Sequence, residues 1–540
     1  MVTIILLFIA IILILALFAI NISDTYGIPS LLLFLVLGIV CKFLGIQFQN
    51  YEVAESFSTL ALMVIMFYGG FGTNWSMGKP VVKEAVVLSS LGVVSTALLT
   101  GLFAHYLLGF SMLEGMLLGS IVGSTDYASV SNILSSKNLN LKYNTSPLLE
   151  LESGSNDPTA YSMTMLFLSL IAGTNVSVPI LIARQVIIGV GLGFLLAIGV
   201  KKILEKINLN KDGLAIVFMA AMALLTYSLT AILGGNGYLA VYLFGIYVGN
   251  QHFLGKRDVV FFFDGATELM NIGLFFLLGL LSEPVQILSA LPVALLIMLF
   301  MTFIARPLSV FGLTLPFRLK LNQLLTISWA GLRGAAAIAF AIMVVNSDIP
   351  FINDIYHIVF GICFLSSLFQ GSLMPWVAQK TDMLDPNDTV LKTFNYYQDK
   401  SDISFLETKI SKGSKLVGTK VKDLNLAFDF IVAKIKRSNK TIVPRGEVVL
   451  EEGDTIVIGG EEYFDPMGKD LIEFTITASH PWVNQKIVDL NLPSDILILM
   501  IQRADSEIVV AAGDTVILEG DRIILISDEN VDFEERRPEG

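Results

Sequence analysis

Apolar stretches follow one another along the first 380 residues of the chain, separated by short polar loops. A membrane-spanning helix needs about 20 mainly apolar residues. Thirteen stretches approach or exceed that length: 3–21, 30–46, 57–74, 82–109, 112–134, 146–172, 177–203, 213–233, 236–249, 260–282, 286–314, 322–346 and 355–379. The pattern predicts a polytopic α-helical membrane protein with about 13 transmembrane helices in residues 1–380.

The loops between these stretches alternate in charge, and the alternation predicts an orientation. Loops after odd-numbered stretches contain the basic residues Lys79, Lys83, Lys137, Lys142, Lys201, Lys202, Lys206, Lys211, Lys256, Arg257, Arg318 and Lys320. Loops after even-numbered stretches contain mainly acidic residues: Glu52, Glu55, Glu114, Glu283, Asp348 and Asp354. Because basic loops stay in the cytoplasm, the N-terminus is expected outside and the C-terminal tail in the cytoplasm. The first stretch lacks the features of a signal peptide and is interpreted as the first span.

Composition separates this membrane part from a soluble tail. Of the 540 residues, 54% are hydrophobic and only 15% are charged, whereas soluble proteins have about 25% charged residues. Residues 1–380 contain 17 basic and 17 acidic side chains, so residues 381–540 carry the whole net charge of −12. This excludes a single soluble enzyme, and the acidic tail argues against nucleic acid as a partner. Cys41 and Cys363 offer no disulfide framework or metal-ligand spacing.

Polar and ionisable residues interrupt several apolar stretches. Ionisable side chains inside a membrane span are costly and indicate function by default. The fifth stretch contains Gly123-Ser124-Thr125-Asp126, the sixth contains Glu152-Ser153-Gly154-Ser155-Asn156-Asp157-Pro158, the tenth contains Asp264 and Glu268, and the eleventh and twelfth contain Arg306 and Arg333. We expect the functional site among these residues.

The sixth stretch predicts a cation site that a proton can also occupy. Ser153 and Asp157 share one helix face, and Glu152 and Asn156 share the adjacent face. Pro158 has no N–H and leaves the Gly154 carbonyl without its helical partner. This set of oxygen ligands suits a small hard cation, and the buried Asp157 carboxylate can bind a proton instead. The alternative is that Asp157 only packs against or caps a helix break.

The fifth and twelfth stretches predict discontinuous helices. Thr125 and Asp126 follow glycines 115, 119 and 123, whose four-residue spacing permits close helix approach, and residues 330–337 are similarly small. We expect two broken helices that cross near the bilayer midplane. Because the two stretches are seven spans apart, they run in opposite directions, as inverted-topology repeats require. For the glycines alone, ordinary tight packing is the alternative.

Two arginines within the spans need partners inside the membrane. For Arg333 we expect helix C-terminal carbonyls or a carboxylate. For Arg306 we predict a structural ion pair with Glu152, which leaves Asp126 and Asp157 for transport.

These motifs resemble the monovalent cation:proton antiporter-1 family, and most closely its potassium/proton branch. The residues that carry the resemblance are Thr125-Asp126, Glu152-Ser153, Asn156-Asp157, Arg306-Pro307 and Gly331-Leu332-Arg333-Gly334. The resemblance implies alternating access by an elevator-like core, a homodimer in a bacterial inner membrane, and Asp157 as the exchanging carboxylate.

The resemblance also assigns roles to the neighbouring residues. An Asn before Asp157 implies electroneutral exchange, Thr125 and Asp126 would support the ion site, and Arg333 would hold the unwound twelfth span. With Ser153 from the helix-face argument, the predicted cation ligands are Asp157, Ser153, Thr125 and Asp126. One departure is Tyr68-Gly69-Gly70, where relatives often have a carboxylate before the glycines.

The tail contains an internal repeat. A polar linker, residues 381–403, precedes β-like alternation in which 423–426 recurs as 489–492, 430–437 as 496–503, and 452–454 as 519–521. We predict two tandem small α/β domains, residues 404–465 and 470–530. Because each is small for an independent hydrophobic core, pairing with a twin is expected.

Each repeat resembles the C-terminal ligand-binding domain of potassium-conductance regulators, the RCK or TrkA C-terminal type. This implies a regulatory ligand at a dimer interface, with cyclic di-AMP as one candidate and Arg437, Asn439, His480 and Arg503 as the residues to test. A purely structural dimerisation module is the alternative. No G-x-G-x-x-G follows a strand in the tail, so we predict no dinucleotide-binding partner domain, no control by NAD and no cofactor.

The leading interpretation is a secondary antiporter that exchanges K⁺ or Na⁺ for H⁺ across the lipid bilayer under control of its tail. A ligand-gated cation channel is the alternative, although no Thr-Val-Gly-Tyr-Gly filter run is present. A sensor with an inert transport core is a third possibility, against which the intact Asp157 cluster argues. No nucleophile–base pair or metal set indicates an enzyme.

Overall fold

The computed structural model describes most of the membrane part and the strands of the tail. The described residues are 2–384, except 27–28, 47, 136–138, 175–176, 205–212, 252, 254 and 348. In the tail they are 403–410, 416–421, 431–437, 440–442, 444–461, 471–476, 480–490, 492, 496–503, 508–510 and 513–527. The chain divides into two compact units, Met1–Asp399 and Lys400–Gly540.

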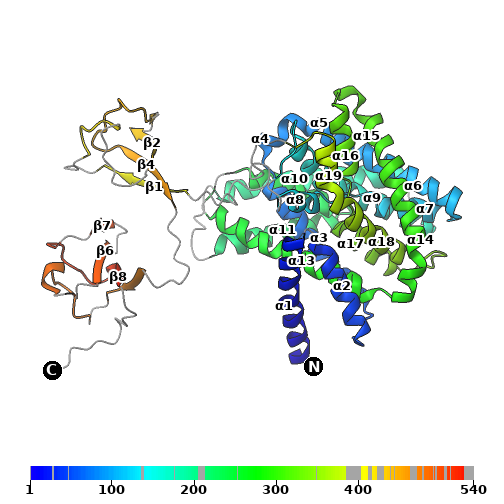
Figure 1. The fold of residues 1–540 in the computed structure, drawn as a ribbon, viewed down its shortest axis with the longest axis horizontal. Helices are drawn as coiled ribbons and strands as arrows, with labels where there is room; N and C mark the ends of the chain where they lie inside the picture. Colours follow the sequence, from blue (N-terminus) through cyan, green and yellow to red (C-terminus); the bar gives the residue numbers. More distant parts are fainter. Residues whose placement is uncertain are drawn as a thin grey trace. The chain divides into compact units, whose positions relative to one another are not determined.

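The first unit is helical, and its helices pack into one bundle (Figure 1). The α-helices are α1 (Val2–Tyr26), α2 (Ser30–Phe43), α3 (Tyr51–Gly72), α4 (Trp75–Gly78), α5 (Val82–Val87), α6 (Val93–Leu108), α7 (Met112–Ile121), α8 (Tyr127–Ser135), α9 (Thr145–Ile171), α10 (Val178–Leu204), α11 (Leu214–Ile232), α12 (Gly237–Gly249), α13 (Lys256–Leu281), α14 (Pro284–Phe300), α15 (Arg306–Thr314), α16 (Leu321–Trp329), α17 (Ala335–Val345), α18 (Ile355–Leu365) and α19 (Ser372–Lys380).

Short irregular turns join some of these helices into longer ones. Two 3₁₀ turns are η1 (Lys79–Val81) and η4 (Leu315–Phe317). Three π-helical turns are η2 (Leu88–Gly92), η3 (Met301–Ala305) and η5 (Ser366–Gly371). π-turns inside α-helices are frequent at functional sites, and residues of η3 and η5 line a pocket together with Arg306 and Arg333.

Within the described residues, eight helical segments are long and apolar enough to cross a membrane: Leu6–Ser23, Tyr51–Gly72, Trp75–Leu108, Val178–Leu204, Leu214–Ile232, Lys256–Leu281, Pro284–Phe317 and Ile355–Lys380. Four shorter apolar helices, α2, α7, α12 and α17, accompany them. α9 is long but polar, and it is continuous through Pro158. It contains most of the residues singled out in the sixth stretch.

The two stretches predicted to be discontinuous are interrupted in the structure. Between α7 and α8 the chain is non-helical from Val122 to Asp126. Between α16 and α17 it is non-helical from Ala330 to Gly334. Both breaks contain glycine: Gly123 in the first, and Gly331 and Gly334 in the second. Glycine has a low helix propensity and no side-chain bulk, so these segments can leave the helix and still pack inside the unit.

The tail contains two small antiparallel sheets with the same strand order. The first is β1-β4-β2-β3, with β1 (Ile403–Lys409), β2 (Ile431–Arg437), β3 (Lys440–Ile442) and β4 (Thr455–Glu461). The second is β5-β8-β6-β7, with β5 (Leu471–Thr475), β6 (Ile496–Gln502), β7 (Ile508–Val510) and β8 (Arg522–Ser527).

The cores of the two sheets follow the sequence repeat. Ile410, Ile435, Leu450 and Ile456 are buried in the first, and Ile476, Ile501, Ile517 and Ile523 occupy the corresponding places in the second. The helical part expected of each repeat is represented among the described tail residues only by short turns, such as the 3₁₀ helix η8 (Ile487–Leu490).

Candidate ion-binding site between two helix breaks

The two helix breaks lie directly against each other. The backbone N–H of Asp126 donates a 2.9 Å hydrogen bond to the carbonyl oxygen of Leu332. A Cβ atom on Gly334 would lie only 2.2 Å from the Asp126 carboxylate, so this approach requires glycine. The backbones of the two broken helices therefore satisfy part of each other's hydrogen-bonding capacity, which bilayer lipid cannot do.

Arg333 stabilises the first helix break by binding its backbone carbonyls. Its buried guanidinium donates hydrogen bonds of 3.0 and 2.5 Å to the carbonyl oxygens of Gly123 and Ser124. These carbonyls follow the C-terminal end of α7, where unpaired oxygens and the helix dipole favour a cation. Arg333 thus replaces the intrahelical hydrogen bonds that α7 loses at the break.

α9 holds the first break from the other side. The Ser153 hydroxyl donates to the Thr125 carbonyl oxygen at 2.7 Å and accepts from the Tyr127 N–H at 2.9 Å. The Asn156 side-chain amide donates to the Thr125 hydroxyl at 2.6 Å. Ser153 and Asn156 therefore fix the extended segment, and most of the bonding capacity of Ser153 is used in doing so.

The two aspartates of the site differ in their hydrogen bonding. Asp126 accepts hydrogen bonds from the Ser129 hydroxyl and, at 3.2 Å, from the Ser129 N–H, so its carboxylate caps the start of α8. Asp157 is only 7% exposed, and its Oδ1 has no hydrogen-bond partner among the described residues. The Asn156 Oδ1 on the adjacent residue is also buried without a partner there.

The Asp157 Oδ1 and the Asn156 Oδ1 are the oxygens of the site that are available to bind a ligand. A buried acceptor without a donor costs about 1–3 kcal/mol. Two adjacent acceptors of this kind therefore indicate a ligand that binds both oxygens. Hard monovalent cations take oxygen ligands, and a proton can bind the same carboxylate. Asp126 lies within electrostatic range of Asp157, and repulsion between two negative charges favours a cation or a proton bound at the site.

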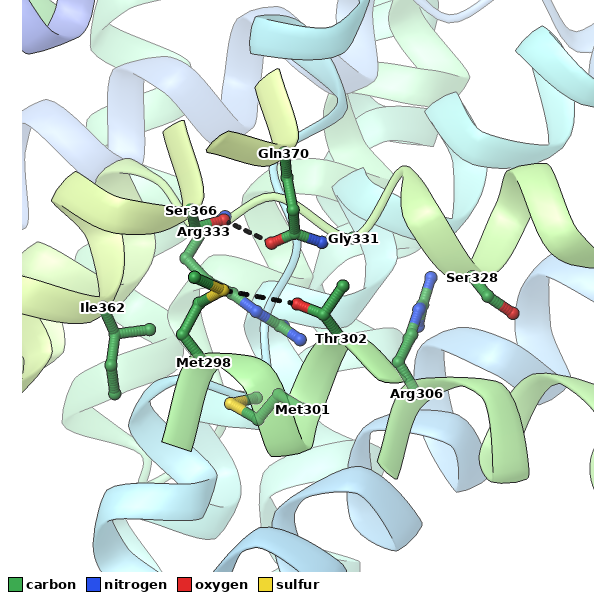
Figure 2. Close-up of a pocket in the computed structure, with 10 residues that line it drawn as sticks. All are labelled: Met298, Met301, Thr302, Arg306, Ser328, Gly331, Arg333, Ile362, Ser366 and Gln370. Atoms are coloured by element: carbon green, nitrogen blue, oxygen red, sulfur yellow. Dashed lines mark hydrogen bonds between the residues drawn. The ribbon is translucent and has the colours of Figure 1, made fainter. Parts of the chain in front are cut away.

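Arg306 and Glu152 form a buried ion pair, with 2.7 Å between the guanidinium nitrogen and a carboxylate oxygen and exposed side-chain fractions of 2% and 0%. The pair joins the start of α15 to α9. Beside it lies a pocket at the second helix break, lined by Arg306 and Arg333 and by residues of the π-turns η3 and η5 (Figure 2). Within it the Ser366 hydroxyl donates to the Gln370 side-chain oxygen at 2.9 Å.

One long-range contact was missed by sequence reasoning. The Tyr68 hydroxyl donates a 2.6 Å hydrogen bond to the Asp264 carboxylate. Tyr68 stands at the position where relatives often have a carboxylate, and Asp264 is one of the ionisable residues of the tenth apolar stretch. The two are 196 residues apart, and no local pattern connects them.

The tail arginines proposed as ligand residues are engaged inside their own repeats. Arg437 binds both carboxylate oxygens of buried Asp454, at 2.7 and 2.8 Å, and Arg503 binds buried Asp521 at 2.6 Å. The Arg437 hydrogen bonds hold the pKa of Asp454 below its usual value and raise the pKa of Arg437. These contacts give both arginines a structural role, and a ligand role stays a prediction.

Of the other two predicted ligand residues, the structure describes only His480. His480 accepts a 3.2 Å hydrogen bond from the Trp482 N–H, and burial lowers the pKa of its imidazole. Asn439 lies outside the described residues.

Comparison with known proteins defines the class. Residues 10–380 match the transmembrane domain of the sodium/hydrogen exchanger family, and residues 405–462 and 471–531 each match the TrkA-C domain. Since the first match covers more than half of the chain, the protein belongs to the sodium/hydrogen exchanger family. It is a multi-pass membrane protein and a cation/proton antiporter with a TrkA-C tail.

Individual relatives agree with this class. The K(+)/H(+) antiporter NhaP2 of Shewanella sp. (strain ANA-3) is 32% identical over 453 residues, covering 82% of this chain and 78% of the relative. The K(+)/H(+) antiporter NhaP of Alkalimonas amylolytica is 35% identical over 378 residues, covering 68% and 65%. The structure of the sodium proton antiporter MjNhaP1 from Methanocaldococcus jannaschii at pH 8 has the same fold, with a TM-score of 0.64, 24% identity, and coverage of 70% of this chain and 99% of that one.

Proposed function

We propose that the protein exchanges K⁺ for H⁺ at Asp157, one for one. The observation that carries the proposal is the buried Asp157 carboxylate, whose Oδ1 has no partner in the described part of the chain, next to the equally unpartnered Asn156 Oδ1. Two relatives more than 30% identical are named potassium/proton antiporters, which favours K⁺ over Na⁺ as the cation.

The chemistry is a competition between two cations for one carboxylate. With a proton on Asp157 the site is neutralised and releases the metal cation; without it, Asp157 and Asn156 supply oxygen ligands, supported by Asp126, Thr125 and Ser153. Asn156 cannot ionise, so only one carboxylate changes occupancy in each cycle. The exchange is therefore electroneutral, with the Arg306–Glu152 pair and Arg333 as fixed structural charges.

The proposed topology has 13 membrane crossings. The eight long apolar segments and α9 account for nine, α2 and α12 for two short ones, and the broken pairs α7–α8 and α16–α17 for the last two. With the N-terminus outside, the two broken helices run in opposite directions and contribute to inverted repeats. The charge alternation of the loops supports a cytoplasmic tail at the bacterial inner membrane.

We also propose that the tail, with domains at 404–465 and 470–530 behind a linker at 381–403, regulates exchange. A contact at the start of this linker supports the idea. Lys142, in the loop between α8 and α9, donates a backbone hydrogen bond of 2.8 Å to the Met383 carbonyl, and its ammonium contacts the Asp382 carboxylate at 2.9 Å. The linker is thus attached to the loop that joins the two helices of the ion site.

The homodimer and the tail ligand belong to the same proposal. Small repeats without a large core favour pairing between copies, and cyclic di-AMP is the first compound to test. Light scattering of the purified protein and ligand-dependent thermal shifts examine these two points separately from transport.

Proton flux into proteoliposomes tests the exchange itself. An outward K⁺ gradient should drive proton uptake that does not depend on membrane voltage, with smaller responses to Na⁺ and Li⁺. The Asp157→Asn variant should be folded and inactive. Potassium current without proton movement would instead identify a channel, and normal flux in D157N would refute the site.

A further inference from the structure

A third buried carboxylate on α9, beside those of Glu152 and Asp157, has no role in the site described above. Glu150 is 7% exposed, and its Oε1 has no hydrogen-bond partner within the described part of the chain. No described lysine, arginine or histidine forms an ion pair with it. The sequence places it near the end of a span, where it could reach the membrane surface, but the structure buries it in the protein. A carboxyl group is expensive to keep there, so its position calls for an explanation.

Glu150 lies on the same side of α9 as Asp157. Seven residues separate them, which corresponds to about 10 Å along the helix and nearly two full turns, so their side chains project from one face. Glu150 is nearer the end at which α9 begins, next to the 139–144 loop. In the proposed topology that end faces the cytoplasm.

A tyrosine hydroxyl from another helix lies against α9 at Gly154, which stands between Glu150 and Asp157 along the helix. A Cβ atom on Gly154, which lies between Glu150 and Asp157, would be 2.7 Å from the Tyr242 hydroxyl oxygen. Tyr242 belongs to α12, is 1% exposed, and its hydroxyl has no hydrogen-bond partner among the described residues. Both carboxylates lie close enough to interact electrostatically with this phenol. Glycine at 154 is therefore what admits the hydroxyl to the α9 surface.

The described groups around Glu150 are too few in oxygen ligands for a cation site. Thr73, at the end of α3, places its hydroxyl beside the Glu150 carboxyl. Tyr127 on α8 is within electrostatic range, and α5, which also packs on α9, carries Glu84. A cation held here would need several oxygen ligands, whereas a carboxyl and a hydroxyl that can both donate and accept are sufficient to pass a proton.

We propose that Glu150 is a proton-transfer residue that connects the cytoplasmic side with Asp157 through the Tyr242 hydroxyl. In the step that delivers a proton to the cytoplasm, the phenol accepts a proton from the Asp157 side, directly or through water, and gives its own proton to the Glu150 carboxylate. Tyr242 is unchanged by the transfer, one proton moves, and Glu150 then releases it to the cytoplasmic side. This role rests on the proposed exchange at Asp157.

The relay is tested with the full-length protein in proteoliposomes. Turnover at saturating K⁺ and the KM for K⁺ are measured at a series of internal pH values. Glu150→Gln should lower turnover at least about tenfold, in the range of a lost proton-transfer group, and flatten its dependence on internal pH without changing KM. Glu150→Asp should retain most of the rate, and Tyr242→Phe should fall between. Glu114→Gln is the matched control, because Glu114 is also buried but accepts hydrogen bonds from Ile352 and Asn353.

The relay is overturned if E150Q has the turnover and the pH dependence of the wild type. It is also overturned if E150Q has a raised KM for K⁺ with unchanged turnover, because Glu150 would then be a cation ligand. If E150Q does not fold, E150D and Y242F decide the question in the same assay. Normal exchange in D157N would refute the underlying function, whereas an inactive D157N with a normal E150Q would refute only the relay.

Discussion

The side-chain amide of Asn156 donates a 2.6 Å hydrogen bond to the hydroxyl of Thr125. This bond turns the amide nitrogen toward the first helix break and leaves the Asn156 oxygen available beside Asp157. The orientation of a ligand oxygen in the ion site therefore depends on a hydroxyl in another helix.

Replacing Thr125 by Val should weaken cation binding while leaving the fold intact. The loss of one hydrogen bond, about 1.4 kcal/mol, corresponds to a roughly tenfold higher KM for K⁺. Thr125→Ser keeps the hydroxyl and serves as the control. Transport assays over a range of K⁺ concentrations measure the effect, and equal KM values in the two variants would show that Thr125 does not orient Asn156.

Glu152→Gln should destabilise the membrane unit, because it leaves the Arg306 guanidinium charged and unpaired at 2% exposure. Breaking a buried ion pair typically costs about 3–5 kcal/mol. The expected result is a lower yield and a lower thermal unfolding temperature in detergent.

The double variant Glu152→Gln, Arg306→Met removes the stranded charge and should recover much of that stability. If E152Q has the wild-type unfolding temperature and changes only the KM for K⁺, then Glu152 acts in ion binding rather than as a structural partner.

The Lys142–Asp382 contact should affect regulation more than stability. Lys142 and Asp382 are on the surface, with side-chain exposures of 23% and 83%, and such pairs contribute about 0–1 kcal/mol. Lys142→Ala should shift the pH at which exchange switches on, in the same direction as deletion of residues 404–540. The effects of K142A and the deletion should not add, and additive effects would show that the linker contact is independent of the tail.

Stability of the first tail repeat should fall in acid. The pKa of Asp454 lies below its usual value because Arg437 hydrogen bonds to the carboxylate. A lowered pKa adds stability that is complete above about pH 4 and is lost as the pH falls through the lowered value.

Urea unfolding of residues 400–540 between pH 7 and pH 3 measures this dependence. Arg437→Gln should be less stable at pH 7 and should lose less stability on acidification. Parallel pH curves for the two proteins would show that the pair does not stabilise the repeat.

Much of the site could be predicted from single residues and their spacing. A guanidinium inside a membrane must find carbonyls or a carboxylate, and that requirement alone pointed Arg333 and Arg306 toward groups they contact in the structure. Small residues at 330–337 and the Gly-Ser-Thr-Asp run likewise indicated where helices are interrupted.

What could not be predicted depends on helix packing. The Tyr68–Asp264 bond and the burial of Glu150 arise from helices that are distant in sequence. In the tail, by contrast, a signal was present: Arg437 and Asp454 recur as Arg503 and Asp521. The repeated arginine and the repeated acidic turn are two halves of one ion pair, and interpreting the arginines only as ligand residues missed it.

Calorimetric titration of the purified protein with K⁺, in buffers of different ionisation enthalpy, tests the central claim most directly. If cation and proton compete for Asp157, K⁺ binding near the midpoint of the proton titration should release protons, and Asp157→Asn should show neither K⁺ binding nor proton release. Potassium binding without proton release, or K⁺-coupled proton release that persists in D157N, would contradict it.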